Sequence, residues 1–276
     1  MNSKNSILLV DPEFDPNTAE NCNLLIRITA DSLSYAIIDK THQQIKAVYD
    51  QQDCLDVAEV LSARLKQDTY LMLTFKEVKI SVYTENTIAI PNAIFDEQDL
   101  DSYAKFFSAN QSNKLYVQPA NQYGLTTIFS LDQFVDELLS SSLECLQFFN
   151  HEAPVLAMTA EKKKVLILDF TAASFNALYI NEGQLIFQNY YQVENVEEFN
   201  YYLLFMLKAL QINAPETEVN LSGIIHTGDP NHLCISKYFN QIQFTEAPAL
   251  TAIDRSILED MPAHYYSSLL ALDLCG

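Results

Sequence analysis

Two segments of the chain resemble each other, and this internal repeat restricts the possible folds more than any other feature. Residues 24–48 (LLIRITADSLSYAIIDKTHQQIKAV) align without a gap with residues 164–188 (KVLILDFTAASFNALYINEGQLIFQ), at an offset of 140 residues. Apolar residues match along the alignment, for example Leu25 with Val165. A repeat of this kind indicates one structural unit that is present twice. We therefore expect a fold made of two related halves.

Each copy of the repeat has the pattern of three short strands joined by tight turns. An apolar run comes first, and a polar turn follows it at residues 29–34 or 169–174. The second strand is expected at residues 35–38 or 175–180, and a further turn leads to the third strand. Apolar, β-prone runs bounded by turn residues are typical of hairpins.

A helix and a further strand are expected after each copy. In the first half, apolar residues at helical spacing follow Asp53, which we expect as the N-cap. In the second half, Asn195 precedes a similar pattern, and Glu198 completes a capping box. Strands are expected next at residues 78–83 and 219–225. Each half is thus predicted as β-β-β-α-β, which is an α/β fold.

The first half carries additional elements. Acidic residues open a helix at Asp96, and strands are expected at residues 115–117 and 125–129. A capping box at Ser130 opens another helix. A last short helix is expected at residues 262–272, with proline in its first turn.

These elements predict the domain organisation. We expect an N-terminal arm at residues 1–20 that is extended and solvated. A first domain is expected at residues 21–152, and a second at residues 153–276 that ends in the C-terminal helix.

The charge balance argues against two classes of partner. Lys and Arg number 16 and Asp and Glu number 36, so the net charge is −20. Nucleic acids and anionic membranes both attract clustered Lys and Arg, so we expect neither as a partner. No apolar run reaches the length of a membrane-spanning helix. The five cysteines are scattered without a CxxC motif, which is typical of reduced thiols, and we expect a cytoplasmic location.

Glycine is scarce, which bears on nucleotide binding. The chain has 5 glycines, whereas typical usage of about 7% gives roughly 19. Phosphate-binding turns usually need glycine, and no G-x-G-x-x-G motif occurs. The loop with His226, Asp229 and His232 fits no standard zinc spacing, so we expect a turn before a helix and no metal there.

The layout resembles that of the actin-like ATPases, in which two RNase H-like domains enclose a nucleotide cleft. The chain is also similar to an uncharacterised bacterial family, found in Bacteroidetes, with an actin-like ATPase fold. Three segments carry this resemblance: the stretch from Val78 to Phe95, which contains KISVYTENTIAIPNAIF, the helix VEEFNYYLLFMLKALQI, and the strand–loop–helix LSGIIHTGDPNHLCISKYF. The resemblance covers most of the chain after the N-terminal arm. It implies two RNase H-like halves, each a mixed five-stranded-type sheet with flanking helices.

The resemblance also implies where a nucleotide site would lie, and the sequence departs from the family pattern there. Active members carry an Asp-x-Gly turn in each first hairpin, where the Asp holds a hydrated metal and the Gly admits a phosphate. A third, glycine-rich turn receives adenosine, and here its second glycine is replaced. The vestigial positions in this chain are Thr29 and Asp31 in the first copy, Asp169 and Thr171 in the second copy, and Gly223 in the third turn.

Three such departures together remove the phosphate cradle. We therefore expect a non-catalytic protein, a degenerate actin-like ATPase that acts as a binding or scaffold module for a protein partner, with no cofactor and no metal. The alternative is a divergent ATP-dependent phosphotransferase that uses Asp169 as a metal-bound carboxylate, with ATP and Mg²⁺ as cofactors. A third hypothesis is self-assembly into filaments. A side chain of Phe170 or Asp31 that fills the cleft favours the first hypothesis over the second.

Overall fold

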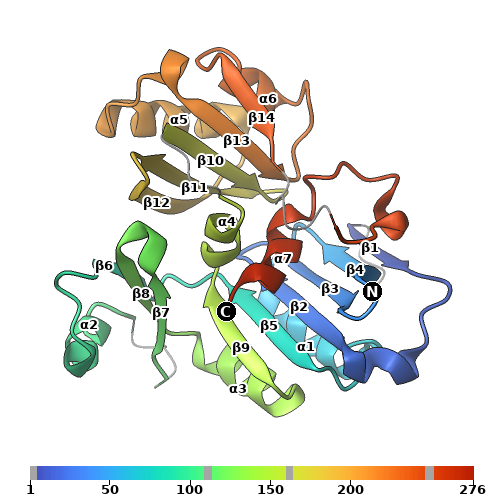
Figure 1. Cartoon of the computed structure of the whole chain (residues 1–276). Helices are drawn as coiled ribbons and strands as arrows, with labels where there is room; N and C mark the ends of the chain where they lie inside the picture. The colour runs from blue at the N-terminus through green and yellow to red at the C-terminus, as the bar shows by residue number, and fades with distance from the viewer. Residues whose placement is uncertain (1–4, 109–113, 160–163, 246–251) are drawn as a thin grey trace.

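The computed structural model describes residues 5–108, 114–159, 164–245 and 252–276. Two large sheets, one from each half, lie on either side of the helices α4 (Ala153–Ala157) and α7 (Ser267–Ala271) (Figure 1). The first sheet has the order β1-β4-β3-β2-β5-β9, and the second has the order β12-β11-β10-β13-β14. A small third sheet, β6-β8-β7, belongs to the first half.

The strands of the first sheet are β1 (Ser6–Val10), β2 (Cys22–Ile28), β3 (Leu33–Asp39), β4 (Gln44–Gln51), β5 (Glu77–Val82) and β9 (Leu146–Asn150). Those of the second are β10 (Lys164–Phe170), β11 (Ser174–Asn181), β12 (Gln184–Gln192), β13 (Glu218–Gly223) and β14 (Gln241–Phe244). The third contains β6 (Thr87–Pro91), β7 (Tyr116–Ala120) and β8 (Leu125–Phe129). The remaining α-helices are α1 (Val57–Gln67), α2 (Leu100–Ala104), α3 (Gln133–Ser142), α5 (Val196–Ala209) and α6 (Pro230–Ile235).

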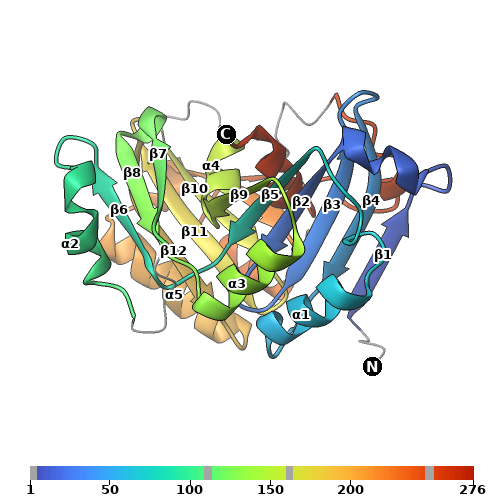
Figure 2. The same cartoon turned by 90° about the horizontal axis from the view of Figure 1, so that it is seen from below.

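Apolar side chains cover both faces of each large sheet. The outer face of the first sheet packs on α1 and α3 (Figure 2), and the outer face of the second packs on α5 and α6 (Figure 1). The inner faces share one core with α4 and α7, in which Leu25 and Ile167 are buried together with Leu269. This arrangement explains why every residue of β2 and β3 is buried, including the polar ones.

The predicted α/β repeat is confirmed, since both halves contain β-β-β-α-β with the same pairing. In each half the first strand lies antiparallel to the second and parallel to the strand that follows the helix. The second sheet has the predicted five strands, whereas the first has six because β1 adds an edge strand. The predicted strands at residues 78–83 and 125–129 correspond to β5 and β8.

The gapless alignment of the two copies is wrong over their first two strands. In these strands, a residue of the first copy and the residue at the equivalent pairing position of the second copy are 142 positions apart in the sequence. The offset returns to 140 only in the third strand, because the loop after β3 is two residues longer than the loop after β11. The pairs that define the offsets are Ile28 with Leu33 and Phe170 with Phe175 in the first hairpin, and Ile38 with Ile45 and Ile180 with Leu185 in the second. The residue equivalent to Asp169 is therefore Arg27, and the residue equivalent to Thr171 is Thr29.

The predicted N-terminal arm is exposed along most of its described residues, but it also contains a strand of the first sheet, which the prediction lacks. Residues Ser6–Val10 form β1, which pairs antiparallel with β4 at the edge of the first sheet. Asp11 follows and accepts a hydrogen bond from Lys46 Nζ at 2.8 Å. The other boundaries, at residues 152 and 153, stay predictions. The C-terminal helix α7 contacts β2 and β3 of the first sheet as well as β13 of the second.

Several helix ends differ from the predictions by a few residues. Asp56, not Asp53, caps α1, because its carboxylate accepts from the N–H of Glu59. Asp132 rather than Ser130 caps α3. The acidic segment after Asp96 forms only a short 3₁₀ turn and α2, and α7 occupies only the end of the predicted helix at 262–272. The Asn195 cap of α5 is confirmed.

Candidate functional site

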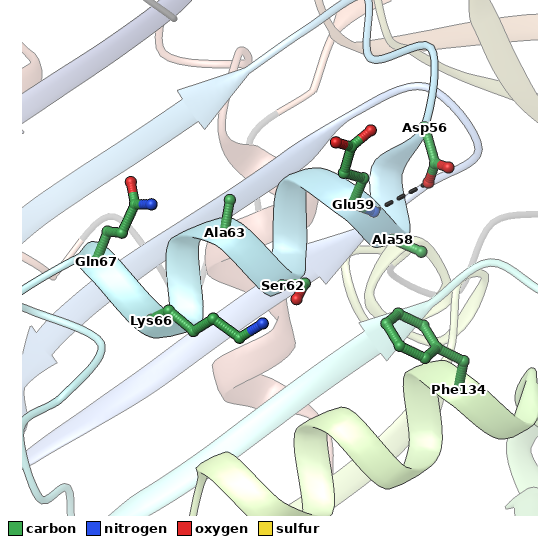
Figure 3. A pocket seen from close by; sticks show the side chains of 8 residues that line it. All are labelled: Asp56, Ala58, Glu59, Ser62, Ala63, Lys66, Gln67 and Phe134. Carbon is green, nitrogen blue, oxygen red and sulfur yellow. Dashed lines mark hydrogen bonds between the residues drawn. The ribbon is translucent and has the colours of Figure 1, made fainter.

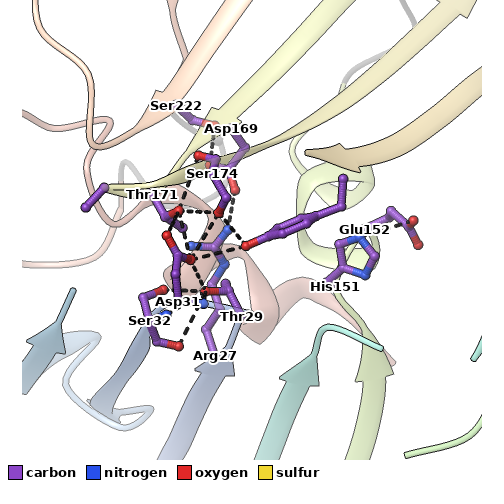
Figure 4. A network of polar contacts seen from close by, with 12 residues as sticks. Arg27, Thr29, Asp31, Ser32, His151, Glu152, Asp169, Thr171, Ser174 and Ser222 are labelled. Carbon is purple, nitrogen blue, oxygen red and sulfur yellow. Dashed lines mark hydrogen bonds and ion pairs between the residues drawn. The ribbon is translucent and has the colours of Figure 1, made fainter. Parts of the chain in front are cut away.

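The first hairpin of each half closes with a turn of the sequence Thr-Ala-x-Ser, and the two turns meet between the halves (Figure 4). We call residues 29–32 the first turn and residues 171–174 the second turn. In each, the Thr N–H donates to the Ser carbonyl, at 3.0 Å in the first turn and 2.9 Å in the second. The Thr and Ser hydroxyls also contact each other. The same short sequence thus builds the same polar structure twice.

The carboxylate of Asp31 crosses the boundary and is held by the second turn. It accepts hydrogen bonds from Thr171 Oγ1 at 2.7 Å, from Ser174 Oγ at 3.0 Å and from the backbone N–H of Ala173 at 3.0 Å. In its own turn it accepts from Thr29 Oγ1 at 2.8 Å. Asp31 is buried, so water does not compete strongly for these bonds.

The second turn has the character of an anion site. Backbone N–H groups and hydroxyls that converge in a turn favour a negatively charged group. Asp31 supplies that negative charge from within the chain. The N–H of Ala172 is also taken by the first half, because it donates to the amide oxygen of Gln52 at 3.1 Å. The donors that could face a phosphate are therefore already bonded.

The carboxylate of Asp169 is engaged in a similar way. Arg27 Nη2 lies 2.5 Å from Asp169 Oδ2, and the hydroxyl of Ser222 donates to Oδ1 at 2.7 Å. The two charged side chains occupy equivalent positions in the repeat and are almost fully buried. Both oxygens of the carboxylate that would bind a metal in the phosphotransferase hypothesis are thus occupied by groups of this chain.

The cavity that the described residues enclose beside Arg27 is small. The cavity next to Arg27 has a volume of about 10 Å³ and is lined from both halves, by Asp50 and Gln52 on one side and by Phe170 and Ile224 on the other. That volume suits a single water molecule, whereas pockets for small ligands measure about 300–1,000 Å³. At this point the two halves are closed on each other.

Gly223 is required by the backbone rather than by a ligand. Its φ of +79° is the left-handed conformation that favours glycine, and a Cβ there would lie 2.0 Å from the carbonyl oxygen of Phe170. Its N–H donates to the carbonyl of His264 at 2.9 Å. The glycine therefore lets β13 pair closely with β10 and connects to the C-terminal segment.

Tyr190 closes the side of the Asp31 contact. Its hydroxyl is 3.2 Å from Asp31 Oδ1, and its ring packs on Tyr83 at a centroid distance of 4.1 Å and on His151 at 5.5 Å. Burial, and after it the charge of Asp31, raise the pKa of Tyr190. The hydroxyl therefore stays protonated and can act as a donor.

Three further ionisable groups near the boundary are shifted by burial. Burial raises the pKa of Asp50 to about 6 and that of Glu152 to about 7. Burial, followed by the charge of Arg27, lowers the pKa of His151 to about 3. His151 Nε2 lies 3.3 Å from Glu152 Oε1, but a neutral imidazole makes no ion pair. His151 is therefore neutral at pH 7, and the two carboxyls hold their protons to a higher pH than exposed ones do.

Four of the five predicted positions, Thr29, Asp31, Asp169 and Thr171, lie together at the boundary, and Gly223 supports the neighbouring strand pair. The sequence reasoning missed five side chains that contact them. These are Arg27, Ser32, Ser174, Tyr190 and Ser222. Two signals in the sequence pointed to some of them: the charged Arg27 inside the apolar run of β2, and the Thr-Ala-x-Ser pattern, which contains the two turn serines. Ser222 and Tyr190 have no such local signal.

The histidine loop forms the predicted turn before a helix. The Asp229 carboxylate accepts from the N–H of His226 at 2.6 Å, and α6 begins at Pro230. Among the residues that the structure describes, no three His, Cys, Asp or Glu side chains converge as metal ligands would. Over the same residues, none of the helices combines the length and the apolar character needed to cross a bilayer.

Comparison with known proteins identifies the fold and the family. The family described as a protein of unknown function (DUF3822) matches residues 11–242. A protein with an actin-like ATPase fold and unknown function from Bacteroides thetaiotaomicron superposes with a TM-score of 0.75 at 17% identity, covering 95% of this chain and 99% of that one. A comparison with curated proteins gives no match.

Two further solved structures share the architecture. The PilM-PilN type IV pilus biogenesis complex has a TM-score of 0.62 at 13% identity and covers 91% of this chain and 96% of that one. The ethanolamine utilization protein EutJ from Carboxydothermus hydrogenoformans has a TM-score of 0.51 at 8% identity, with coverages of 97% and 93%. At these identities the likeness establishes the actin-like ATPase fold alone.

Proposed function

This chain belongs to the DUF3822 family, whose function is unknown, and we propose that it is a non-catalytic protein-binding module built on a degenerate actin-like ATPase fold. The observation that carries the proposal is the closure between the two repeat turns. The Asp31 carboxylate of the first half occupies the anion site of the second turn, and the Arg27 guanidinium of the first half forms an ion pair with Asp169. Both charges that a metal–nucleotide complex would bring are supplied by the chain.

The buried contacts give the closure a structural purpose. They join the two halves, because the side chains of Asp31 and Arg27 both reach across the boundary between the halves. Opening the site for a nucleotide would break the ion pair of Arg27 with Asp169 and the hydrogen bonds that Asp31 accepts from the second turn. Closure therefore favours a fixed arrangement of the halves over an opening and closing cycle.

A protein is the partner class that the surface supports best. The net charge of −20 opposes nucleic acid and anionic membrane. The structural neighbour PilM-PilN is a complex of two proteins, which supports a binding role for this architecture. We propose a cytosolic location, which agrees with five cysteines that are all free.

An assay of Mg-ATP turnover tests the non-catalytic proposal against the phosphotransferase alternative. Phosphate release is measured with millimolar Mg-ATP for the wild type and for Asp169→Ala. We expect both proteins to give the rate of the protein-free blank. Turnover by the wild type that disappears in Asp169→Ala would overturn the proposal and assign Asp169 as the metal-bound carboxylate.

A further inference from the structure

A groove runs between α1 and α3 on the outer side of the first half (Figure 3). It consists of two cavities, of about 330 Å³ and about 520 Å³, which share Ala58 as a lining residue. The inner cavity lies against the ends of β2 and β5, and the outer cavity continues along α1 past Phe134. The groove lies within the first half, and its inner cavity is lined by Thr29 and Ala30 of the first turn as well as by α1.

The inner cavity lies where the topology of the sheet opens a crevice. After β2 the chain turns to β3 on one side, whereas after β5 it leaves through β6 and returns as β9 on the other side. β2 and β5 are parallel neighbours, so their connections diverge at the same edge. In open α/β sheets, ligands bind in the crevice at such a switch point, outside the carboxyl ends of the strands.

The lining combines an apolar floor with an exposed aromatic wall. The floor of the inner cavity consists of aliphatic side chains from two strands and two helices: Ile28, Val57, Leu61, Val82 and Val135. In the outer cavity, Phe134 is 54% exposed, and its ring projects from α3 toward α1 (Figure 3). An apolar side chain of another protein could fill the inner cavity while Phe134 packs against its neighbour.

The charges around the groove are mostly negative. Among the described residues that line the two cavities, four are acidic (Asp56, Glu59, Glu85 and Asp132) and one is basic (Lys66). The chain as a whole carries −20. A second copy of this chain would bring the same negative charge to the groove, whereas a basic segment would be attracted to it.

We infer that this groove binds a short segment of a partner protein in which one or two large apolar side chains are flanked by Lys or Arg. This inference rests on the proposed protein-binding function and names its site. The apolar side chain enters the inner cavity between Val57 and Val135, and the basic residues face the carboxylates at the rim. A segment with acidic flanks would meet repulsion at the same rim.

Selection from a random library of twelve-residue peptides tests the inference. The library is displayed on phage and selected against the full chain at 150 mM NaCl, and the Kd of each enriched peptide is measured by fluorescence anisotropy. Two variants alter the groove. Phe134→Ser removes its aromatic wall, and Ala58→Trp places a large side chain at the residue that lines both cavities. Phe205→Ser is the matched control, because Phe205 on α5 is 53% exposed and lies in the other half.

We expect enriched peptides to combine an aromatic or large aliphatic residue with Lys or Arg. Their Kd should rise at least tenfold in Phe134→Ser and in Ala58→Trp and change less than twofold in Phe205→Ser. Raising NaCl to 500 mM should weaken them, because the charges at the rim are exposed to solvent. Unchanged melting temperatures of the variants show that the fold is intact.

Three outcomes contradict the inference that the groove binds such a segment: no enriched peptide, peptides with acidic flanks, or peptides that bind Ala58→Trp as tightly as the wild type. Loss of binding in Phe205→Ser alone would move the interface to α5 and would also overturn it. None of these outcomes touches the non-catalytic proposal, which stands or fails on Mg-ATP turnover.

Discussion

Replacing Asp31 by alanine is the most informative perturbation of the boundary between the halves. The change removes the only carboxylate of the two equivalent turns, since the position equivalent to Asp31 in the second turn is Ala173. Five groups lose an acceptor: the hydroxyls of Thr29, Thr171, Ser174 and Tyr190 and the N–H of Ala173. The backbone of the first turn is left intact, so the effect reports on the contact itself.

The expected loss of stability follows from which donors stay satisfied. The four hydroxyls keep other partners, because each Thr hydroxyl contacts a Ser hydroxyl of its own turn and the Tyr190 hydroxyl contacts that of Ser174. The N–H of Ala173, which is partly buried, is left without an acceptor, and such an unsatisfied donor costs about 1–3 kcal/mol when fully buried. Charge-assisted bonds are lost as well, while the cost of burying the carboxylate disappears. We expect a net loss of about 3 kcal/mol.

The assay is thermal unfolding at pH 7, with the exposed Asp260→Ala as the control. For a chain of this size, about 3 kcal/mol corresponds to a fall in Tm of roughly 6–12 °C. Added phosphate should then restore part of the loss in Asp31→Ala, because the vacated second turn accepts an anion. At ten times its Kd, phosphate contributes about 1.4 kcal/mol.

The phosphate response separates this account from a simple packing defect. Sodium chloride at equal ionic strength controls for screening. The reasoning is refuted if Asp31→Ala melts at the wild-type temperature, or if phosphate raises the Tm of the wild type as much as that of the variant.

Other substitutions test the remaining contacts. Gly223→Ala places a Cβ 2.0 Å from the Phe170 carbonyl oxygen and should cost well over 3 kcal/mol of stability or abolish folding. Gly183→Ala, at a φ of +77° with open space around it, should cost only about 1–2 kcal/mol. Equal denaturation midpoints for the two variants would contradict the close approach of β10 and β13. Arg27→Ala should cost about 3–5 kcal/mol of stability, and adding Asp169→Ala should recover part of that loss. A double-mutant cycle of urea unfolding measures this coupling, and additive losses would mean that the two charges do not interact. Burial raises the pKa of Asp50 from 3.8 to about 6, so the folded state holds the Asp50 proton more tightly than the unfolded state does. Stability therefore falls as pH rises from about 4 to about 7, and Asp50→Asn should remove up to roughly 3 kcal/mol of that fall. A pH profile of Tm that is the same in Asp50→Asn as in the wild type would contradict the shift.

The sequence predicts the duplicated α/β architecture because buried strands leave a strong apolar pattern. It cannot by itself fix the alignment of the copies. Side chains alternate between the two faces of a strand, so a slip of two residues returns each side chain to the same face. Offsets of 140 and 142 therefore give similar apolar matches, and only the polar Thr-Ala-x-Ser turns distinguish them.

The contacts of the site depend on pairing across the chain, which no local pattern encodes. Arg27 in an apolar run indicates a buried charge with a partner, but its partner lies 142 residues away. The strand β1 was missed for a similar reason, because Ser6–Val10 is stabilised by pairing with β4 rather than by a strong pattern of its own. In contrast, the Asn195 cap is a local feature, and its prediction is confirmed. The positions matched to the metal-binding Asp and the phosphate-binding Gly in the first copy were placed two residues too late, because they followed the 140-residue offset.

A thermal-shift titration of the wild type with ATP and ADP, with and without Mg²⁺, tests the central claim most directly. A ligand present at 100 times its Kd stabilises a protein by about 2.7 kcal/mol, which is a shift of several degrees. Because Arg27 and Asp31 already occupy the charged positions between the halves, we predict no change in Tm up to millimolar nucleotide. A Mg²⁺-dependent rise in Tm that Asp169→Ala removes would contradict the claim that the chain fills its own cleft.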